Sequence, residues 1–60
     1  MDLMTPAELE AESGIKQGTQ AALRSRRQLP FVRLGGGRII RYQRAAIAAW
    51  IAAGVVAVGQ

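Results

Sequence analysis

The sequence predicts a small, mainly α-helical domain with one β-hairpin. Three observations predict it: the chain has 60 residues, helix start and stop signals recur along it, and a Gly-Gly-Gly run separates two short β-like segments. A chain of this length buries only about 60% of the surface that its unfolded form exposes. We therefore expect one compact core and no large substrate pocket.

A first helix is expected to begin after Thr5 and to end before Gly14. Residues 5–8 read Thr-Pro-Ala-Glu, which is a capping box: the Thr5 hydroxyl can accept from the amide of Glu8, and the Glu8 carboxylate can accept from the amide of Thr5. The proline falls at the first helical position, where its missing N–H costs nothing. Leu9 is expected to be the main core contact, and Gly14 can adopt the left-handed conformation that ends a helix.

A second helix is expected from Lys16 or Gln17 to Arg27. A helical wheel gives it one face toward the core and one polar stripe. The core face comprises Ile15, Thr19, Ala22 and Leu23, and the polar stripe comprises Lys16, Gln20, Arg24 and Arg27. A short helix, a tight turn and a second helix form the layout of a helix-turn-helix.

The second half of the chain predicts a hairpin and a final helix. Leu29-Pro30 ends the second helix, residues 31–34 and 38–42 are expected to be strands, and the glycines 35–37 form the hairpin tip. The final helix is expected from Arg44 to Ala53, with Gly54 as its cap. Its residues Ile47, Trp50 and Ile51 have the i, i+3, i+4 spacing of a core-facing stripe.

Together these elements predict a winged helix-turn-helix domain over residues 1–54. Residues 55–60 are expected to be an apolar tail, either disordered or an oligomerisation segment. The apolar stretch 45–58 is shorter than the roughly 20 residues that a bilayer requires, so we expect no membrane span. No secretion signal is visible, and we expect a cytoplasmic protein.

The charges are segregated along the chain. All four acidic residues precede Gly14 and all eight basic residues follow it, which gives a net charge of +4. Seven of the eight are arginine, whose planar fork matches phosphates and guanine edges. This pattern favours a polyanionic partner, with a merely solvated basic surface as the alternative.

The composition argues against catalysis. Cys and His are absent, which removes disulfides, most zinc sites, the commonest general base and the best soft nucleophile. We therefore expect no enzyme activity, no catalytic residue, no metal, no cofactor and no small-molecule substrate.

The candidate functional residues are those expected to face double-stranded DNA. A recognition helix reads base edges in the major groove, where glutamine amides pair with adenine, and lysine or arginine reaches guanine or phosphate. A glycine tip lets a hairpin approach the minor groove or a phosphate closely. The predicted set is Lys16, Gln17, Thr19, Gln20, Arg24 and Arg27 on the helix and Gly36, Gly37 and Arg38 on the wing. Alternatively, the stripe is a solvated face, Thr19 packs in the turn, and Arg41 forms an ion pair with an acid of the first helix.

The order of these motifs resembles the excisionase-type helix-turn-helix family of phages and mobile elements, which shares the winged fold of MerR-type DNA-binding domains. The resemblance runs through residues 3–9 (Leu-Met-Thr-Pro-Ala-Glu-Leu), Gly14-Ile15, Thr19, Leu23-Arg24, residues 30–35 (Pro-Phe-Val-Arg-Leu-Gly), Arg41-Tyr42 and residues 47–51 (Ile-Ala-Ala-Trp-Ile). The family often has an aromatic residue where Leu23 stands, an apolar one at Gln20 and an acid at Ala46.

The resemblance implies a recombination directionality factor, which binds and bends attachment-site DNA and helps a tyrosine recombinase (integrase) excise an element. It also implies a bacterial or phage protein that is associated with the nucleoid. A small transcriptional regulator that binds promoter DNA through the same fold is the alternative, and a protein-interaction adaptor is a third possibility. The alanine-rich outer face of the final helix and the tail after it suggest self-association along DNA.

Overall fold

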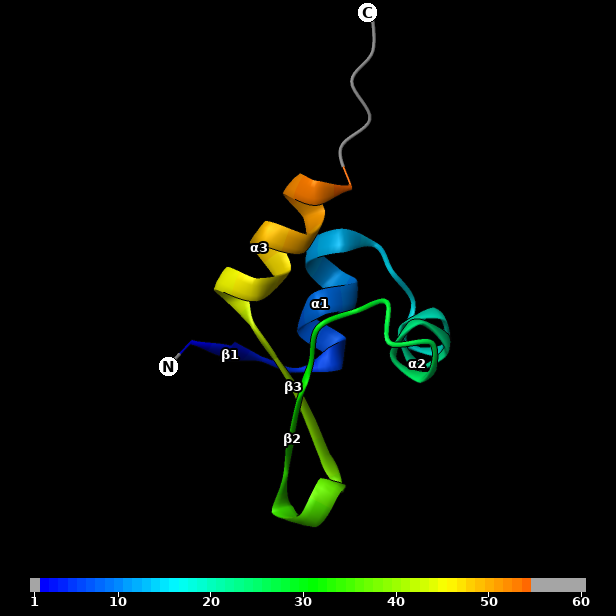
Figure 1. Ribbon diagram of the computed structural model, residues 1–60, viewed down its shortest axis with the longest axis vertical. Helices are drawn as coiled ribbons and strands as arrows, with labels where there is room; N and C mark the ends of the chain where they lie inside the picture. The colour runs from blue at the N-terminus through cyan, green and yellow to red at the C-terminus, as the bar shows by residue number, and fades with distance from the viewer. Residues whose placement is uncertain (1, 55–60) are drawn as a thin grey trace, which may run out of the picture.

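The computed structural model describes residues 2–54 and contains three helices and three strands in that range. In chain order the elements are β1 (Leu3–Met4), α1 (Pro6–Ser13), α2 (Gln17–Ser25), β2 (Val32–Leu34), the glycine turn η1 (Gly35–Gly37), β3 (Ile39–Gln43) and α3 (Arg44–Ala53). The strands form an antiparallel sheet in the order β1-β3-β2. The helices gather at one end, and the β2–β3 hairpin projects away from them (Figure 1). The expected tail, 55–60, lies outside the described residues.

The start and end of α1 confirm the sequence prediction. The Thr5 amide donates to Glu8 Oε1 at 2.8 Å, and the Glu8 amide donates to Thr5 Oγ1 at 3.1 Å, so the capping box is complete. Gly14 ends the helix with a φ of +79°, a conformation that a side chain would disfavour. These local rules fix the length of α1 without tertiary help.

The core lies between one face of the sheet and the helices. Met4 pairs with Tyr42 across β1 and β3, so both side chains lie on the same face of the sheet. The buried apolar residues are Met4, Leu9, Leu29, Tyr42 and Ile47, with Leu23, Phe31, Ile40 and Trp50 packed against them. The indole N–H of Trp50 donates to the Gln28 carbonyl at 2.7 Å, which ties α3 to the segment after α2.

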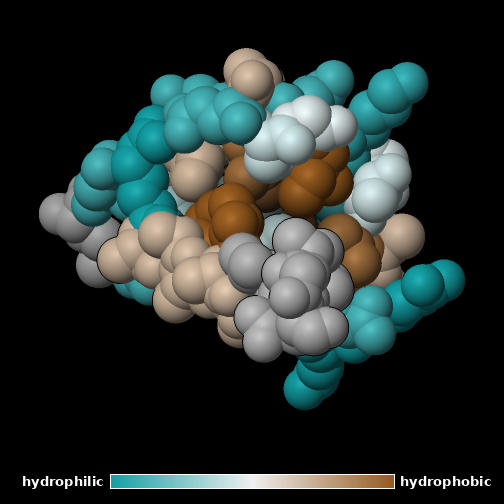
Figure 2. Space-filling view, turned by 90° about the horizontal axis from the view of Figure 1, so that it is seen from above, coloured by the Kyte–Doolittle hydropathy of each residue, from teal (hydrophilic) through white to brown (hydrophobic). Residues whose placement is uncertain are grey.

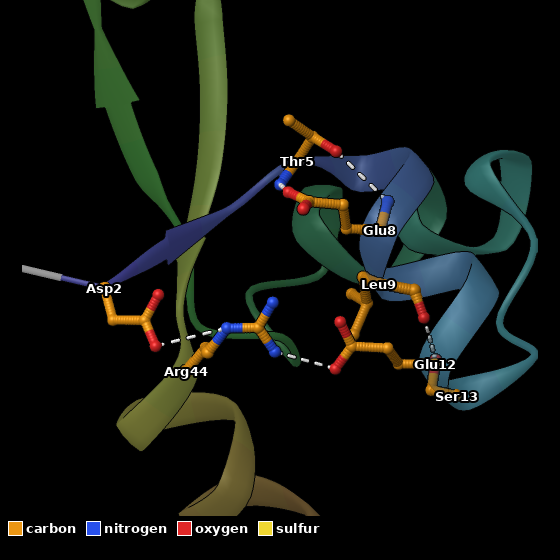
Figure 3. A network of polar contacts seen from close by, with 7 residues as sticks. All are labelled: Asp2, Thr5, Glu8, Leu9, Glu12, Ser13 and Arg44. Carbon is orange, nitrogen blue, oxygen red and sulfur yellow. Dashed lines mark hydrogen bonds and ion pairs between the residues drawn. The ribbon is translucent and has the colours of Figure 1, made fainter.

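Strand β1 was not expected from the sequence, and it extends the predicted hairpin to three strands. Arg44, the first residue of α3, holds this strand in place. Its backbone amide donates to the Asp2 carbonyl at 3.1 Å, and its Nε lies 3.2 Å from the Asp2 carboxylate. Its Nη1 lies 2.8 Å from Glu12 Oε1 on α1, so one guanidinium connects α3 to α1 and to the residue before β1 (Figure 3).

Of the acids of α1, Glu12 therefore forms an ion pair with Arg44. In residues 2–54 none forms one with Arg41, so the alternative that paired Arg41 with an acid of the first helix is wrong. Arg41 instead donates to the carbonyl of Ile40 at 2.7 Å. The hydrogen bond from Arg44 and its positive charge lower the pKa of Glu12. In turn, the hydrogen bond to Glu12 and its negative charge raise the pKa of Arg44.

The end of the second helix also differs from the prediction. Helix α2 ends at Ser25 because the amide of Arg27 donates to Arg24 O at 3.0 Å and that of Gln28 to Leu23 O at 2.9 Å. This pair of bonds is a Schellman motif, and it puts Arg27 in the left-handed region with a φ of +57°. A glycine would have marked this end, and the sequence has none here.

The apolar stripe of α3 is shorter than predicted. Ile47 is buried and Trp50 is partly buried, but Ile51 is 48% exposed, because the helix continues past the edge of the core. Figure 2 views the molecule from above, the side toward which α3 points in Figure 1, and shows apolar side chains in the centre of this face and hydrophilic ones along its upper and right margins. Gly54 caps α3 as expected, with a right-handed backbone conformation.

Candidate functional site

The polar stripe predicted for α2 is divided in the structure. Gln20 is fully buried, so its prediction as a DNA contact is wrong. Its Nε2 donates to the carbonyls of Pro6 at 3.0 Å and Ile15 at 2.9 Å, and its Oε1 accepts from the Tyr42 hydroxyl at 2.9 Å. An amide with partners on α1, on the turn and on β3 is a structural element of the core.

The helical wheel assigned the buried and exposed faces of the second helix wrongly, because α2 is rotated about its axis relative to the expected orientation. Thr19 and Ala22, assigned to the core face, are exposed, whereas Ile15 and Leu23 are partly buried. Gln20, assigned to the outer stripe, takes the innermost position. The exposed predicted residues of the first turn are therefore Lys16, Gln17 and Thr19, with Lys16 as the N-cap of the helix.

Arg24 lies between the buried core and the exposed face of α2. It is partly buried, and its Nη1 donates to the Tyr42 hydroxyl, which itself donates to Gln20. The guanidinium carbon lies 6.0 Å from the centre of the Tyr42 ring. Arg24 is thus the outer end of a hydrogen-bonded chain that begins inside the core. The exposed Arg27 follows in the turn after α2.

The hairpin tip has the backbone freedom that the sequence predicted. All three glycines of η1 have positive φ, from +58° to +93°, which side chains rarely adopt. Apart from Gly36 and its two chain neighbours, no heavy atom lies within 4 Å of where a Cβ on Gly36 would be, so the space beside the tip is open. Arg38 is exposed beside it, and Arg33 lies 5.4 Å from the Phe31 ring across the hairpin from Gly37.

Two open depressions lie between α2 and the hairpin. The first, of about 670 Å³, lies beside the C-terminal end of α2, and the second, of about 340 Å³, lies beside its N-terminal end and β3. Arg24 borders both. The first is lined by Arg24, Ser25, Arg27, Leu29, Pro30, Phe31 and Arg33, and the second by Pro6, Gln17, Arg24, Arg38, Ile39, Ile40 and Arg41.

The two depressions, which share Arg24, are therefore lined by five arginines, which we call the arginine surface: Arg24, Arg27, Arg33, Arg38 and Arg41. In the described part of the chain, the ion pairs join Arg44 to Asp2 and Glu12 and involve none of these five. None of these five guanidinium groups therefore has a carboxylate partner in residues 2–54. The site brings together the predicted Arg24, Arg27, Gln17 and Arg38, whereas Lys16, Thr19, Gly36 and Gly37 lie outside both depressions.

Arg33 and Arg41 were not among the predicted site residues. Arg33 could have been found from its place beside the glycine tip, opposite Arg38. Arg41 had no such signal, because its position depends on how the middle strand β3 passes α2. The sequence analysis named it only in an alternative, as the ion-pair partner of an acid of the first helix.

No group of three or more His, Cys, Asp or Glu side chains is placed to hold a metal ion in residues 2–54. None of the helices described there has the length and apolar character of a membrane span. Against known proteins, no family model, no curated protein and no solved structure matches the chain.

Proposed function

We propose that the chain is a winged helix-turn-helix protein that binds double-stranded DNA. In this proposal α1, the turn at Gly14 and α2 form the helix-turn-helix, α2 enters the major groove, and the β2–β3 hairpin is the wing. The observation that carries the proposal is the arginine surface, a concave region with five arginines and no carboxylate paired to them.

The shape of this region fits a duplex better than a small anion. A helix in the major groove and a wing at the neighbouring minor groove straddle one sugar-phosphate strand. The two depressions lie between α2 and the hairpin, where that strand would run. Arginines along such a path supply the phosphate contacts that dominate affinity and fix the position of the protein.

Base reading falls to the exposed first turn of α2. Gln17 has an amide that can pair with adenine, Lys16 can reach guanine, and Thr19 can meet a thymine methyl or a phosphate. All three side chains are exposed. Gln20 is excluded from this role by its burial, which leaves Gln17 as the candidate adenine reader.

The biological role that we propose is that of an excisionase, a recombination directionality factor that binds and bends attachment-site DNA for a tyrosine recombinase. This step is supported by the resemblance of the sequence motifs to that family. The same surface would also serve a promoter-binding regulator, so the experiment must compare the two kinds of DNA.

The test is a gel-shift titration on attachment-region DNA and on a promoter fragment, with excess nonspecific competitor. The proposal predicts specific complexes on the attachment DNA. A single complex confined to the promoter would favour the regulator, and no shift on either DNA at low salt would refute DNA binding.

Arg38→Ala and Arg26→Ala form a matched pair for the same assay. Both remove one exposed arginine, but Arg26 lines neither depression. We expect Arg38→Ala to weaken binding about eightfold at 0.1 M salt, because each phosphate contact contributes roughly 0.9 to the slope of log affinity against log salt. Arg26→Ala should weaken binding much less. Equal losses would mean that net charge, not the arginine surface, drives binding.

Self-association along DNA is a separate part of the proposal. The outer face of α3 exposes Ala45, Ala48, Ala49, Ala52 and Ala53, a surface without charge. Ala49→Glu should convert a cooperative ladder of complexes on repeated sites into independent binding while single-site affinity is kept. Unchanged cooperativity would exclude this face.

A further inference from the structure

We propose that Arg24 is a preset phosphate-binding side chain and that Tyr42 and Gln20 are the residues that position it. The inference rests on the proposed function for its ligand, a backbone phosphate of duplex DNA. It goes beyond that function because it assigns one arginine of the surface a fixed geometry, and it assigns two core residues a role in binding.

A chain of hydrogen bonds fixes the Arg24 guanidinium to the interior. Gln20 is held by the carbonyls of Pro6 and Ile15, it accepts from the Tyr42 hydroxyl, and that hydroxyl accepts from Arg24 Nη1. Tyr42 and Gln20 are both fully buried, so neither can move without disturbing the core. Arg24 therefore enters binding with much of its rotamer freedom already lost, which lowers the entropic cost of the contact.

The electrostatic surroundings of Arg24 favour an anion. A partly buried cation is usually paired with a carboxylate. Arg24 has instead a neutral phenol as its partner, and no ion pair in residues 2–54 involves it. The nearby depressions add four more guanidinium groups and no carboxylate. A phosphate between α2 and the hairpin would supply the missing negative charge.

The position of Arg24 on α2 favours phosphate over a base edge. Recognition helices read bases mainly with their first turns, whereas Arg24 lies in the last turn of α2. It also borders both depressions, the region in which the sugar-phosphate strand would lie. A phosphate contact fixes the register of the protein on DNA without reading sequence.

The test compares the parent protein with Arg24→Ala, Tyr42→Phe and the double variant on a preferred and a nonspecific duplex. We expect Arg24→Ala to weaken binding to both duplexes by the same factor, about eightfold at 0.1 M salt, and to reduce the slope of log affinity against log salt by about 0.9. A loss restricted to the preferred duplex would mean a base contact and would overturn the phosphate assignment.

Tyr42→Phe keeps the ring in the core and removes only the hydroxyl that holds Arg24. We expect it to weaken binding about two- to tenfold, the cost of ordering a freed side chain, and to have no effect when Arg24 is already alanine. A Tyr42→Phe loss of the same size with and without Arg24 would show a merely structural role. Parent-like binding by Tyr42→Phe would also overturn the positioning role.

Folding is checked by circular dichroism, because Tyr42→Phe leaves the buried Oε1 of Gln20 without its donor. If Tyr42→Phe does not fold, Gln20→Met/Tyr42→Phe replaces both partners by apolar groups and is compared in the same way, with and without Arg24→Ala.

A DNA-free arm separates this inference from the proposed function. Inorganic pyrophosphate, compared with chloride at equal ionic strength, should raise the thermal midpoint of the parent more than that of Arg24→Ala. An equal rise in both proteins would refute an anion site at Arg24. A greater rise in the parent without any DNA binding would keep the site and refute the proposed function.

Discussion

Replacement of Gln20 by alanine should nearly unfold the protein. The side chain is fully buried and makes three hydrogen bonds, to Pro6, Ile15 and Tyr42. A buried polar group left without its partner costs about 1–3 kcal/mol, and the cavity adds to this, so we expect a total loss of about 3–5 kcal/mol. At roughly 0.05–0.15 kcal/mol per residue, a domain of this size has only about 3–9 kcal/mol to lose.

The assay is urea unfolding followed by the fluorescence of Trp50, whose indole is bonded to the Gln28 carbonyl. Gln20→Met, which keeps the volume, should lose less than Gln20→Ala, because it leaves no cavity. Thr19→Ala is the control, since Thr19 is the exposed neighbour and should change stability by less than about 0.5 kcal/mol. If Gln20→Ala were as stable as Thr19→Ala and lost only DNA affinity, Gln20 would be a surface residue and the burial argument would be refuted.

Three further predictions concern caps and charges. Because Arg44 lowers the pKa of Glu12, the ion pair stabilises the fold above the ordinary pKa of 4.5 and is lost as pH falls through the lowered value. The stability of Glu12→Gln should therefore fall less steeply at acid pH than that of the parent. Identical curves would show that the Glu12–Arg44 ion pair does not stabilise the fold. Arg27→Gly should raise the free energy of unfolding by up to about 1 kcal/mol in urea titrations, since it relieves a positive φ, while it weakens DNA binding; a loss of stability would contradict the left-handed cap. Thr5→Ala should lower the free energy of unfolding by about 1 kcal/mol. No change would mean that the capping box does not contribute to stability.

Features encoded by neighbouring residues could be predicted from the sequence. The capping box at Thr5, the left-handed Gly14 and the glycine tip each depend on residues within one or two turns of chain. The final helix was placed at the right bounds for the same reason. Local rules therefore supplied the three helices and the hairpin, which is most of the fold.

Features that depend on contacts distant in sequence could not be predicted. Strand β1 has two residues and is recognisable only by its pairing with β3, 38 or more residues further along the chain. The rotation of α2 follows from the Tyr42 hydroxyl, which gives Gln20 a partner inside the core. A helical wheel assigns a glutamine to the surface because it cannot know of such a partner.

Only those residues of the candidate site that lie near local sequence signals could be predicted. Exposed residues near local signals, such as Lys16, Gln17 and Arg38, were identified. The burial of Gln20 and the place of Arg41 depend on how β3 passes α2, which the sequence pattern does not encode.

The most direct measurement for the central claim is the salt dependence of DNA affinity. If each residue of the arginine surface neutralises one phosphate, log affinity against log salt should have a slope of about −4.5, since each contact contributes roughly 0.9. Arg33→Ala/Arg38→Ala should reduce the slope to about −2.7 by the same rule. A slope near zero for the parent, or one that this double variant leaves unchanged, would contradict the claim that the arginine surface binds the DNA backbone.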